Sequence, residues 1–359
     1  MGNKQTDILL PLFISGITFL TFNEKNIIWK NLDNSDALAL LSINDISKIV
    51  GRSCSSDSWN GKNNLKNART AMRLMEAYSI DALLNTDAAY PALLRETVNA
   101  PFMLFYRGNA GCLAERTVSV VGTRMMSPEG KAAAFSFAYD AVRDGVTVVS
   151  GLADGIDGAA HSGAVEACFD AVESGESASE LCGKTAAVLP CGPDTIAPAN
   201  HKKLAGRILS TGGCLVSEYM PGTPVESWRF VHRNRIIAAL SPATVVVEAP
   251  PGSGALITAE YAVDYSRDVM FHEAAFSMNA AAVSARVKAK LERDFAAGKT
   301  AKHKVENTPE KYLSDGAPVI KNYADYCRCL AEMPGMRSTM QKNKDGQLPL
   351  FDGDGSKEG

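Results

Sequence analysis

The sequence TVSVVGTR at residues 117–124 begins a pattern that recurs three times before residue 270. Each occurrence combines a short apolar run, a turn that contains glycine, and a helical pattern. The later occurrences are VTVVSGLADGID at 146–157, TAAVLPCGPD at 185–194 and TVVVEAPPGSG at 244–254. Short continuous apolar strands that alternate with helices indicate a parallel sheet covered on both faces. The predicted fold class is therefore α/β, with an extended Rossmann-like, mostly parallel sheet.

The turns that follow parallel strands lie along one edge of the sheet, where helix N-termini present unpaired N–H groups. Anions bind readily at such positions. We therefore expect phosphate contacts from these turns, at Gly122, Arg124, Ser150, Gly151, Gly252, Ser253 and Gly254. The predicted ligand is a nucleotide or a nucleic acid.

Length and composition limit the other possibilities. A chain of 359 residues predicts one main domain with smaller attachments. Because the formal net charge is only −3, a polyanion would have to meet a local basic patch. The eight cysteines lack Cys-x-x-Cys spacing, so we expect small buried thiols in a reducing cytoplasm and no metal site. The apolar run Ile8–Leu20 is too short to span a membrane and predicts a packed helix.

The pattern of the chain predicts three parts. Residues 1–80 read as a small helical module that contains a polar linker at 53–67. The main domain is expected at 85–332, with an extra strand near 102–108 and insertions near 168–183 and 277–309. The second insertion is basic and has helical spacing. We expect residues 333–359 to form a polar, flexible tail.

The segment WRFVHRNRIIAAL at 228–240 concentrates basic and aromatic side chains before an apolar helix. If that helix begins near His232, its apolar residues face the sheet, and Arg233 remains free near Phe230, Asn234 and Arg235. Basic side chains at a helix N-terminus oppose its dipole, which suggests that an anion neutralises them. The alternative is that these arginines are structural and bind carbonyl groups or acids of the core.

Other polar residues could extend this groove. Arg124 follows the first strand directly, and Ser127-Pro128 predicts the start of the next helix. Lys184, which enters the third strand, is a further candidate. Asp157 and His161 share one helix face, and we interpret them as a hydrogen-bonded pair that fixes the loop.

Several motifs occur in the same order as in a known family. They are VVGTR (120–124), VSGLADGIDGAAH (149–161), AVLPCG (187–192), SEY (217–219), RNRIIA (233–238), VVEA (246–249) and GSGALITA (252–259). Together they resemble the DprA/Smf family, the DNA-processing proteins of bacteria, over roughly residues 85–275 and again at 312–318. The resemblance implies an extended Rossmann fold that binds single-stranded DNA and a homodimer that loads the RecA recombinase during natural transformation.

The sequence also departs from that family. Residues 1–80 occupy the place of a SAM-like or helix-hairpin-helix-like domain, but the glycine turn Ser15–Thr18 is degenerate. The usual segment after the sixth strand is replaced by His272–Phe276 and the basic helical insertion.

An enzyme is the alternative from another class. Residues 251–255 resemble the phosphate loop of the nucleotide phosphoribohydrolases of the LOG, or "lysine decarboxylase-like", family. In that family the motif continues to an acid that cleaves the glycosidic bond. Here Thr258 stands at that position and Glu260 is displaced by two residues, over half a helical turn. We therefore predict no catalytic activity and no cofactor, and keep a nucleotide-binding module as the milder alternative.

The tail contains one apolar cluster, Gln347-Leu348-Pro349-Leu350-Phe351, in an otherwise polar stretch. Apolar clusters in such segments often dock on a partner. This one resembles the peptide by which bacterial replication and repair proteins bind the DNA sliding clamp. Gln347, Leu348, Leu350 and Phe351 would be the contacts. The alternative is that these side chains pack on the protein's own surface.

Overall fold

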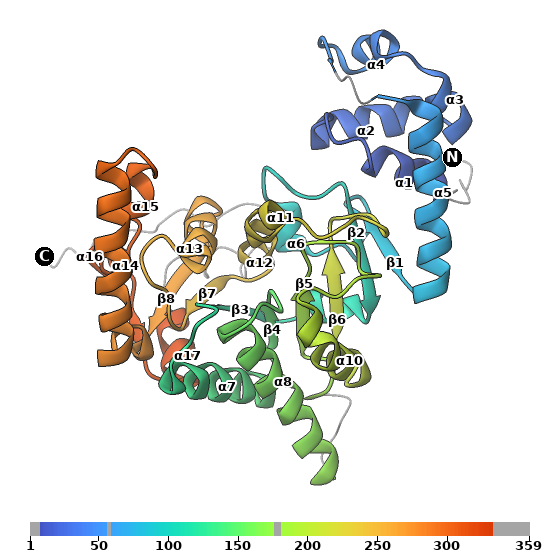
Figure 1. The fold of residues 1–359 in the computed structure, drawn as a ribbon. Helices are drawn as coiled ribbons and strands as arrows, with labels where there is room; N and C mark the ends of the chain where they lie inside the picture. Colours follow the sequence, from blue (N-terminus) through green and yellow to red (C-terminus); the bar gives the residue numbers. More distant parts are fainter. Residues whose placement is uncertain (1–7, 56–58, 176–180, 333–359) are drawn as a thin grey trace, which may run out of the picture.

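The computed structural model describes residues 8–55, 59–175 and 181–332 (Figure 1). Its nine strands form one sheet in the order β1-β2-β6-β5-β4-β3-β7-β8-β9. Strands β3 to β9 pair in parallel, whereas β2 is antiparallel to both β1 and β6. The predicted α/β fold with a mostly parallel sheet is confirmed. The strands are β1 (Asp81–Leu84), β2 (Met103–Gly108), β3 (Thr117–Val121), β4 (Thr147–Ser150), β5 (Thr185–Val188), β6 (Cys214–Ser217), β7 (Ala243–Val246), β8 (Asp268–His272) and β9 (Val319–Ile320).

Both faces of the central strands are buried because successive side chains point to opposite sides. Val188 of β5 and Val216 of β6 belong to the core on one face, and Ala187 and Leu215 belong to the core on the other. This explains why these strands are continuously apolar.

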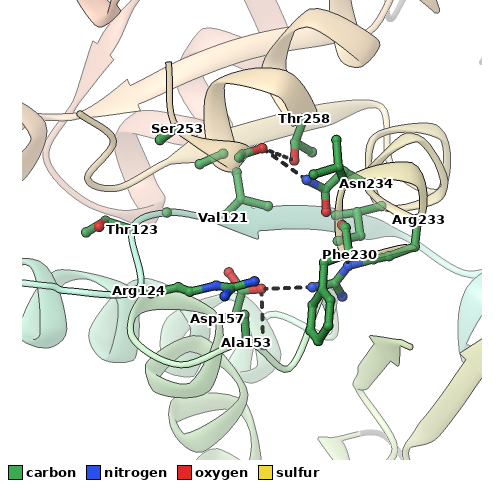
Figure 2. Close-up of a pocket in the computed structure, with 15 residues that line it drawn as sticks. Val121, Thr123, Arg124, Ala153, Asp157, Phe230, Arg233, Asn234, Ser253 and Thr258 are labelled. Carbon is green, nitrogen blue, oxygen red and sulfur yellow. Dashed lines mark hydrogen bonds and ion pairs between the residues drawn. The ribbon is translucent and has the colours of Figure 1, made fainter. Parts of the chain in front are cut away.

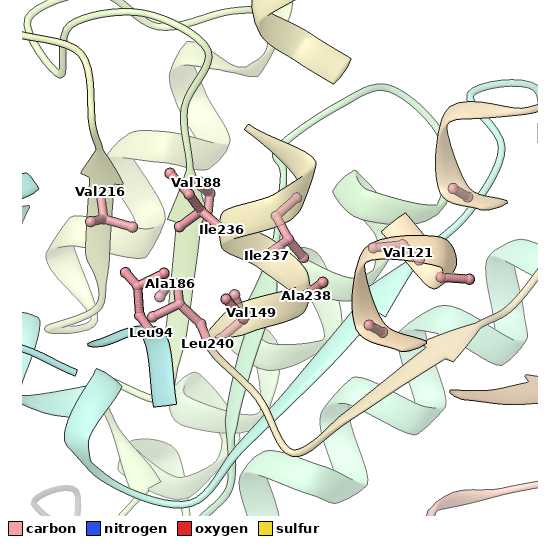
Figure 3. Close-up of a cluster of buried hydrophobic side chains, with 14 of the residues drawn as sticks. Leu94, Val121, Val149, Ala186, Val188, Val216, Ile236, Ile237, Ala238 and Leu240 are labelled. Carbon is pink, nitrogen blue, oxygen red and sulfur yellow. The ribbon is translucent and has the colours of Figure 1, made fainter. Parts of the chain in front are cut away.

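Helices α12 (Asn234–Ala239) and α13 (Gly254–Asp264) cover one face of the sheet. Ile236 and Ile237 of α12 pack against Val149 and Val188 (Figure 3). As expected from the sequence, the apolar residues of this segment face the sheet. The other face is covered by α7 (Pro128–Arg143), α8 (Ile156–Glu173), α10 (Lys202–Ser210) and α17 (Tyr323–Glu332).

Residues 9–55 and 59–78 form a separate group of helices beside β1 and β2 (Figure 1). They are α1 (Leu9–Ser15), α2 (Phe22–Asn31), α3 (Ser35–Leu40), α4 (Ile43–Val50) and α5 (Gly61–Tyr78). Capping boxes at Thr21 and Ser42 begin α2 and α4. The core of this group includes Phe105 of β2, so the helices pack on the edge of the sheet.

The structure corrects or refines three sequence predictions. The polar run at 61–67 belongs to helix α5, because Leu65 and Ala68 supply a buried face and Asn60 caps the start. Residues 168–173, where an insertion is predicted to begin, continue helix α8. Cys168 is not a free thiol: it is disulfide-bonded to Cys182, because the end of α8 brings their Cα atoms to 4.9 Å.

The basic insertion contains two helices, α14 (Met278–Ala296) and α15 (Lys302–Glu306), as its spacing indicates. The remaining helices are α6 (Ala92–Arg95), α11 (Ser227–His232) and α16 (Pro309–Ser314). The proposed clamp-binding residues 347–351 lie outside the described residues. No helix in the described part of the chain is both long and apolar enough to cross a membrane.

Candidate nucleic-acid interface

A pocket of about 340 Å³ opens at the carboxyl edge of the sheet, where β3 ends beside α12 and α13 (Figure 2). The turn after β3, the loop after β4 and the first residues of the two helices form its wall. The predicted site residues that line it are Gly122, Arg124, Phe230, Arg233, Asn234, Ser253 and Gly254. Ser150, Gly151, Lys184, Arg235 and Gly252 lie outside the lining.

Arg124 is the exposed cation of this pocket. Its guanidinium carbon lies 5.1 Å from the centre of the Phe230 ring, which is a cation–π distance. No carboxylate of the described residues pairs with it. A guanidinium held beside an aromatic face, with no acid to neutralise it, is available for a phosphate group.

Arg233, by contrast, is almost completely buried under the pocket. Its guanidinium donates to the carbonyl oxygens of Gly151 and Val188 and lies 3.9 Å from Asp157 Oδ2. Burial lowers the Arg233 pKa to about 10, an effect that the positive charge of Arg124 increases. Its predicted role as a free phosphate contact is therefore corrected, and the structural alternative applies.

Gly151 explains how Arg233 reaches its carbonyl partners. A Cβ atom at position 151 would lie 2.0 Å from the Arg233 guanidinium. Only glycine leaves that space. The glycine expected to approach phosphate instead accommodates an arginine of the protein.

Arg235 is also structural. It pairs with Glu218 and donates to the Asn99 carbonyl oxygen at 2.7 Å. Burial alone would raise the pKa of the Glu218 carboxyl group. Arg235 and His232 oppose this effect, and the net result is a pKa below the ordinary value. The helix expected to begin near His232 begins at Asn234 as α12, and the short helix α11 precedes it.

The N-terminus of α13 provides the neutral part of the pocket. Asn234 Nδ2 donates to the Gly254 carbonyl oxygen at 3.0 Å and fixes the turn against α12 (Figure 2). The Ser253 side chain does not cap the helix, and its buried hydroxyl lacks a partner among the described residues. The first N–H groups of α13 therefore face the pocket without a side-chain cap, a suitable place for an anion.

The neighbouring N-terminus of α7 is already occupied. Ser127 caps the helix and Pro128 follows, as predicted, and Glu248 accepts a hydrogen bond from the Ser127 backbone N–H at 2.9 Å. A buried carboxylate here excludes a second anion. At this edge of the sheet the start of α13, and not the start of α7, is therefore open to an anion.

Lys184 does not belong to this site. It precedes β5 and therefore lies at the amino edge of the parallel strands, where it pairs with Glu115. Because the pocket is at the carboxyl edge, the prediction that Lys184 extends the groove is wrong.

Asp157 and His161 stabilise the loop separately and not as a pair. Asp157 accepts hydrogen bonds from the Gly151 and Ala153 backbone N–H groups, at 3.1 and 3.4 Å. His161 Nδ1 lies 2.8 Å from the Thr185 hydroxyl. Burial raises the Asp157 pKa and lowers the His161 pKa to about 3, so the imidazole is neutral near pH 7.

Trp228 was missed as a site residue although it begins the most distinctive segment of the sequence. Its side chain is 54% exposed at the start of α11, two residues before Phe230. The Arg229 guanidinium lies 5.1 Å from the Trp228 ring and 5.2 Å from the Tyr219 ring. These flat groups contact one another and do not line the pocket. Within the described residues, His, Cys, Asp and Glu form no group that would hold a metal ion.

A family model for DNA recombination-mediator protein A matches residues 81–327, well over half of the chain. The chain belongs to this family. It is similar to protein Smf of Synechocystis sp., at 40% identity over 51% of the chain and 43% of that relative. It is also similar to DNA processing protein DprA of Streptococcus pneumoniae, at 39% identity over 51% of the chain and 59% of that relative. The match thus spans less than two thirds of these relatives.

Solved structures show the same relationship. The X-ray structure of DprA from Streptococcus pneumoniae matches 89% of this chain and 95% of its own, with a TM-score of 0.59 and 26% identity. DNA processing protein A from Helicobacter pylori matches 71% of this chain and 97% of its own, with a TM-score of 0.52 and 21% identity. The second likeness shows the fold alone.

Proposed function

We propose that the protein binds single-stranded DNA in the pocket between Arg124, Phe230 and the start of α13. The observation that carries this proposal is the exposed guanidinium of Arg124, held 5.1 Å from the Phe230 ring centre with no acidic partner in the described residues. Proteins that bind single strands combine cations for the backbone with flat side chains for the bases. The pocket offers both.

The two halves of the pocket suit different parts of a nucleotide. Arg124 and the first N–H groups of α13 would contact phosphate oxygens, as a guanidinium and a helix N-terminus do elsewhere. Phe230, and Trp228 beyond it, would stack on bases. A base paired in a duplex has no free face for such stacking, so the strand must be single.

The class of ligand agrees with the relatives. The structure of the Helicobacter pylori protein concerns its single-stranded DNA binding mode, and curated relatives are DNA processing proteins. We extend that ligand to this chain as a proposal because Arg124 and Phe230 give it a physical basis.

We propose that the protein is not an enzyme. The acid of the pocket, Asp157, is buried and accepts hydrogen bonds from two backbone N–H groups, so it is not placed to attack a ligand. Glu260 does not line the pocket. Both facts argue against the phosphoribohydrolase alternative. Incubation with nucleoside monophosphates should release no free base, and release at enzymatic rates would restore that alternative.

At the cellular level we propose that a homodimer in the cytoplasm protects incoming single strands and loads RecA on them during transformation and recombination. The family match supports this role. The protein should shorten the lag of RecA filament formation on single strands coated with single-strand-binding protein. Tight binding of DNA without any effect on that lag would contradict the loading role alone.

We also propose that Gln347, Leu348, Leu350 and Phe351 bind the DNA sliding clamp. Burying Leu350 and Phe351 would contribute about 1.5–3 kcal/mol each before ordering costs, which suits a weak tether. A peptide of residues 343–355 should bind the clamp, and replacing both residues with Ala should abolish binding. Absence of binding by the intact protein at high micromolar clamp would reject this site.

The direct test of DNA binding compares ligands under matched conditions. Fluorescence anisotropy should show tight binding of a single-stranded oligonucleotide, weaker binding of the same sequence as a duplex, and little competition by free nucleotides. Preference for free nucleotides would favour the nucleotide-binding alternative instead.

A further inference from the structure

The insertion after β8 carries a concentration of positive charge. Residues 278–306 contain seven Lys or Arg against three Asp or Glu, in a chain whose net charge is −3. Within the described residues only Lys302 of these cations has an ion pair, with Glu306. Helices α14 and α15 lie beside β8 and α13 at one side of the molecule (Figure 1). The charge is thus local and available.

The cations of α14 have a defined arrangement. Arg286, Lys290 and Arg293 are four and three residues apart, so they follow one another along one flank of the helix, and all three are exposed. The half-buried residues Val283, Val287 and Leu291 hold a different face against the protein. Lys288 is equally exposed but lies on the opposite flank, two residues from both Arg286 and Lys290.

A second pocket, of about 420 Å³, separates α14 from the start of α7. Asn279, Ala282 and Arg286 line it from the same flank of α14 that continues to Lys290 and Arg293. Thr123 lines this pocket and also the first pocket, so the two adjoin beside Arg124. Its remaining wall includes the uncharged side chains Met125, Met126, Pro128, Ala249, Pro250 and Val283, and also Glu248, whose carboxylate accepts a hydrogen bond from the Ser127 backbone N–H.

The insertion is attached to the loop that forms the first pocket. Gly252 has φ +65° and donates its N–H to the Asn307 carbonyl oxygen at 2.9 Å. A Cβ at this position would lie 2.9 Å from the Lys304 carbonyl oxygen and 3.2 Å from Leu291. The loop therefore contacts the insertion at Gly252 and the first pocket at Ser253 and Gly254. This contact fixes α14 relative to Arg124.

We propose that a single strand leaving the Arg124 pocket continues past Thr123 through the second pocket and along the flank of α14 formed by Arg286, Lys290 and Arg293. This proposal rests on the proposed DNA-binding function and adds a second segment to the binding site. The apolar side chains of the second pocket receive a base, away from Glu248, and the three cations of α14 contact the following phosphates. Arg286 and Arg293 are about 10 Å apart along the helix axis, enough for more than one phosphate.

Charge and continuity favour nucleic acid over an acidic protein partner as the occupant. An acidic peptide would need only the exposed cations, whereas the flank of α14 begins inside a pocket that shares Thr123 with the DNA site. An acidic protein partner would use Arg286, Lys290 and Arg293 without making DNA binding depend on them.

The test compares the variant Arg286→Ala, Lys290→Ala, Arg293→Ala with the control Lys288→Ala in the full chain. Ala favours helix and these positions are exposed, so α14 should stay folded. Anisotropy is measured with oligothymidylates of about 5 and about 16 nucleotides across a salt series. The triple variant should bind the short oligonucleotide normally. With the long oligonucleotide the triple variant should lose affinity at least tenfold. The slope of log affinity against log salt concentration should become shallower by roughly 2, about 0.7 per lost contact.

The outcomes separate the two proposals. If the wild type binds neither oligonucleotide, the proposed function fails and this inference fails with it. If the wild type binds both and the triple variant matches it, only the second segment is wrong, and an acidic protein partner becomes the better explanation of the charge. An equal loss in Lys288→Ala would also overturn the proposal, because it would show a general charge effect and not a defined path.

Discussion

Basic side chains have different partners at the two edges of the sheet. At the amino edge, each of three cations precedes a strand and pairs with an acid: Lys184 with Glu115, Arg116 with Asp144, and Arg267 with Glu96. At the carboxyl edge, Arg124 follows a strand and meets an aromatic ring, and no acid in the described part of the chain pairs with it. The same side-chain chemistry thus serves structure at one edge and leaves a charge for a ligand at the other.

The carboxyl edge also contains a contrast of its own. Arg233 lines the pocket as Arg124 does, yet it is 3% exposed and its donors are used by backbone carbonyls. Arg124 is exposed, and its donors have no partner among the residues that the structure describes. A position at the carboxyl edge therefore does not by itself identify a ligand contact. The side chain must also have hydrogen-bond donors that other groups of the protein do not use.

The largest expected effect comes from removing Arg233. Arg233→Ala leaves two buried carbonyl groups and the Asp157 carboxylate without their partner, so the free energy of unfolding should fall by about 3–5 kcal/mol. Urea denaturation followed by circular dichroism measures this change. Arg233→Lys should recover only part of the loss, since Lys cannot donate in two directions from a planar fork. A fully stable Arg233→Ala protein with weakened DNA binding would reverse the roles assigned to Arg233 and Arg124.

The next effect concerns Phe230. Phe230→Ala removes the ring beside Arg124, and binding of single-stranded DNA should weaken by about 1–3 kcal/mol if a base stacks there. Its stability should change far less than that of Arg233→Ala, because the ring is only partly buried. Phe230→Tyr keeps the stacking surface and should bind normally. Equal affinity for all three proteins would remove the base-stacking part of the pocket.

A smaller effect, on the pH dependence of stability, tests the burial of His161 between the two edges of the sheet. His161 is neutral in the folded protein because burial lowers its pKa to about 3, from an ordinary value of 6.5. Below pH 6.5 the unfolded chain binds the proton and the folded chain does not, so stability falls as pH decreases toward 3. Between pH 7.5 and pH 5.5 this group should remove about 1.4 kcal/mol from the free energy of unfolding. His161→Gln should lose this part of the pH dependence; an unchanged pH profile in that variant would show that His161 is not responsible.

Much of the fold follows from local patterns in the sequence. Continuous apolar strands between helical patterns predict the parallel sheet, and the alternation of faces in β5 and β6 confirms the reason. The start of α5 was harder to predict because it is polar, and its buried face is carried by Leu65, Ala68, Ala71 and Met75. The Cys168–Cys182 bond could not be predicted because the sequence does not give the distance between α8 and the turn before β5.

The site was predicted in part. Gly122, Arg124 and the start of α13 lie where the rule for parallel strands places them. The same rule would have excluded Lys184, which precedes its strand. The burial of Arg233 could not be deduced from spacing, because it depends on the room that Gly151 leaves and on the carbonyl groups that accept its donors.

The difference between the two edges is tested most directly by one matched pair of variants, Arg124→Ala and Lys184→Ala. Each removes one cation that adjoins a strand, the first at the carboxyl edge and the second at the amino edge. Anisotropy with one single-stranded oligonucleotide across a salt series gives affinity and salt slope for both. Arg124→Ala should weaken binding and flatten the slope by roughly 0.7, whereas Lys184→Ala should match the wild type. Equal effects of the two substitutions, or an effect of Lys184→Ala alone, would contradict the assignment of the carboxyl edge as the DNA-binding edge.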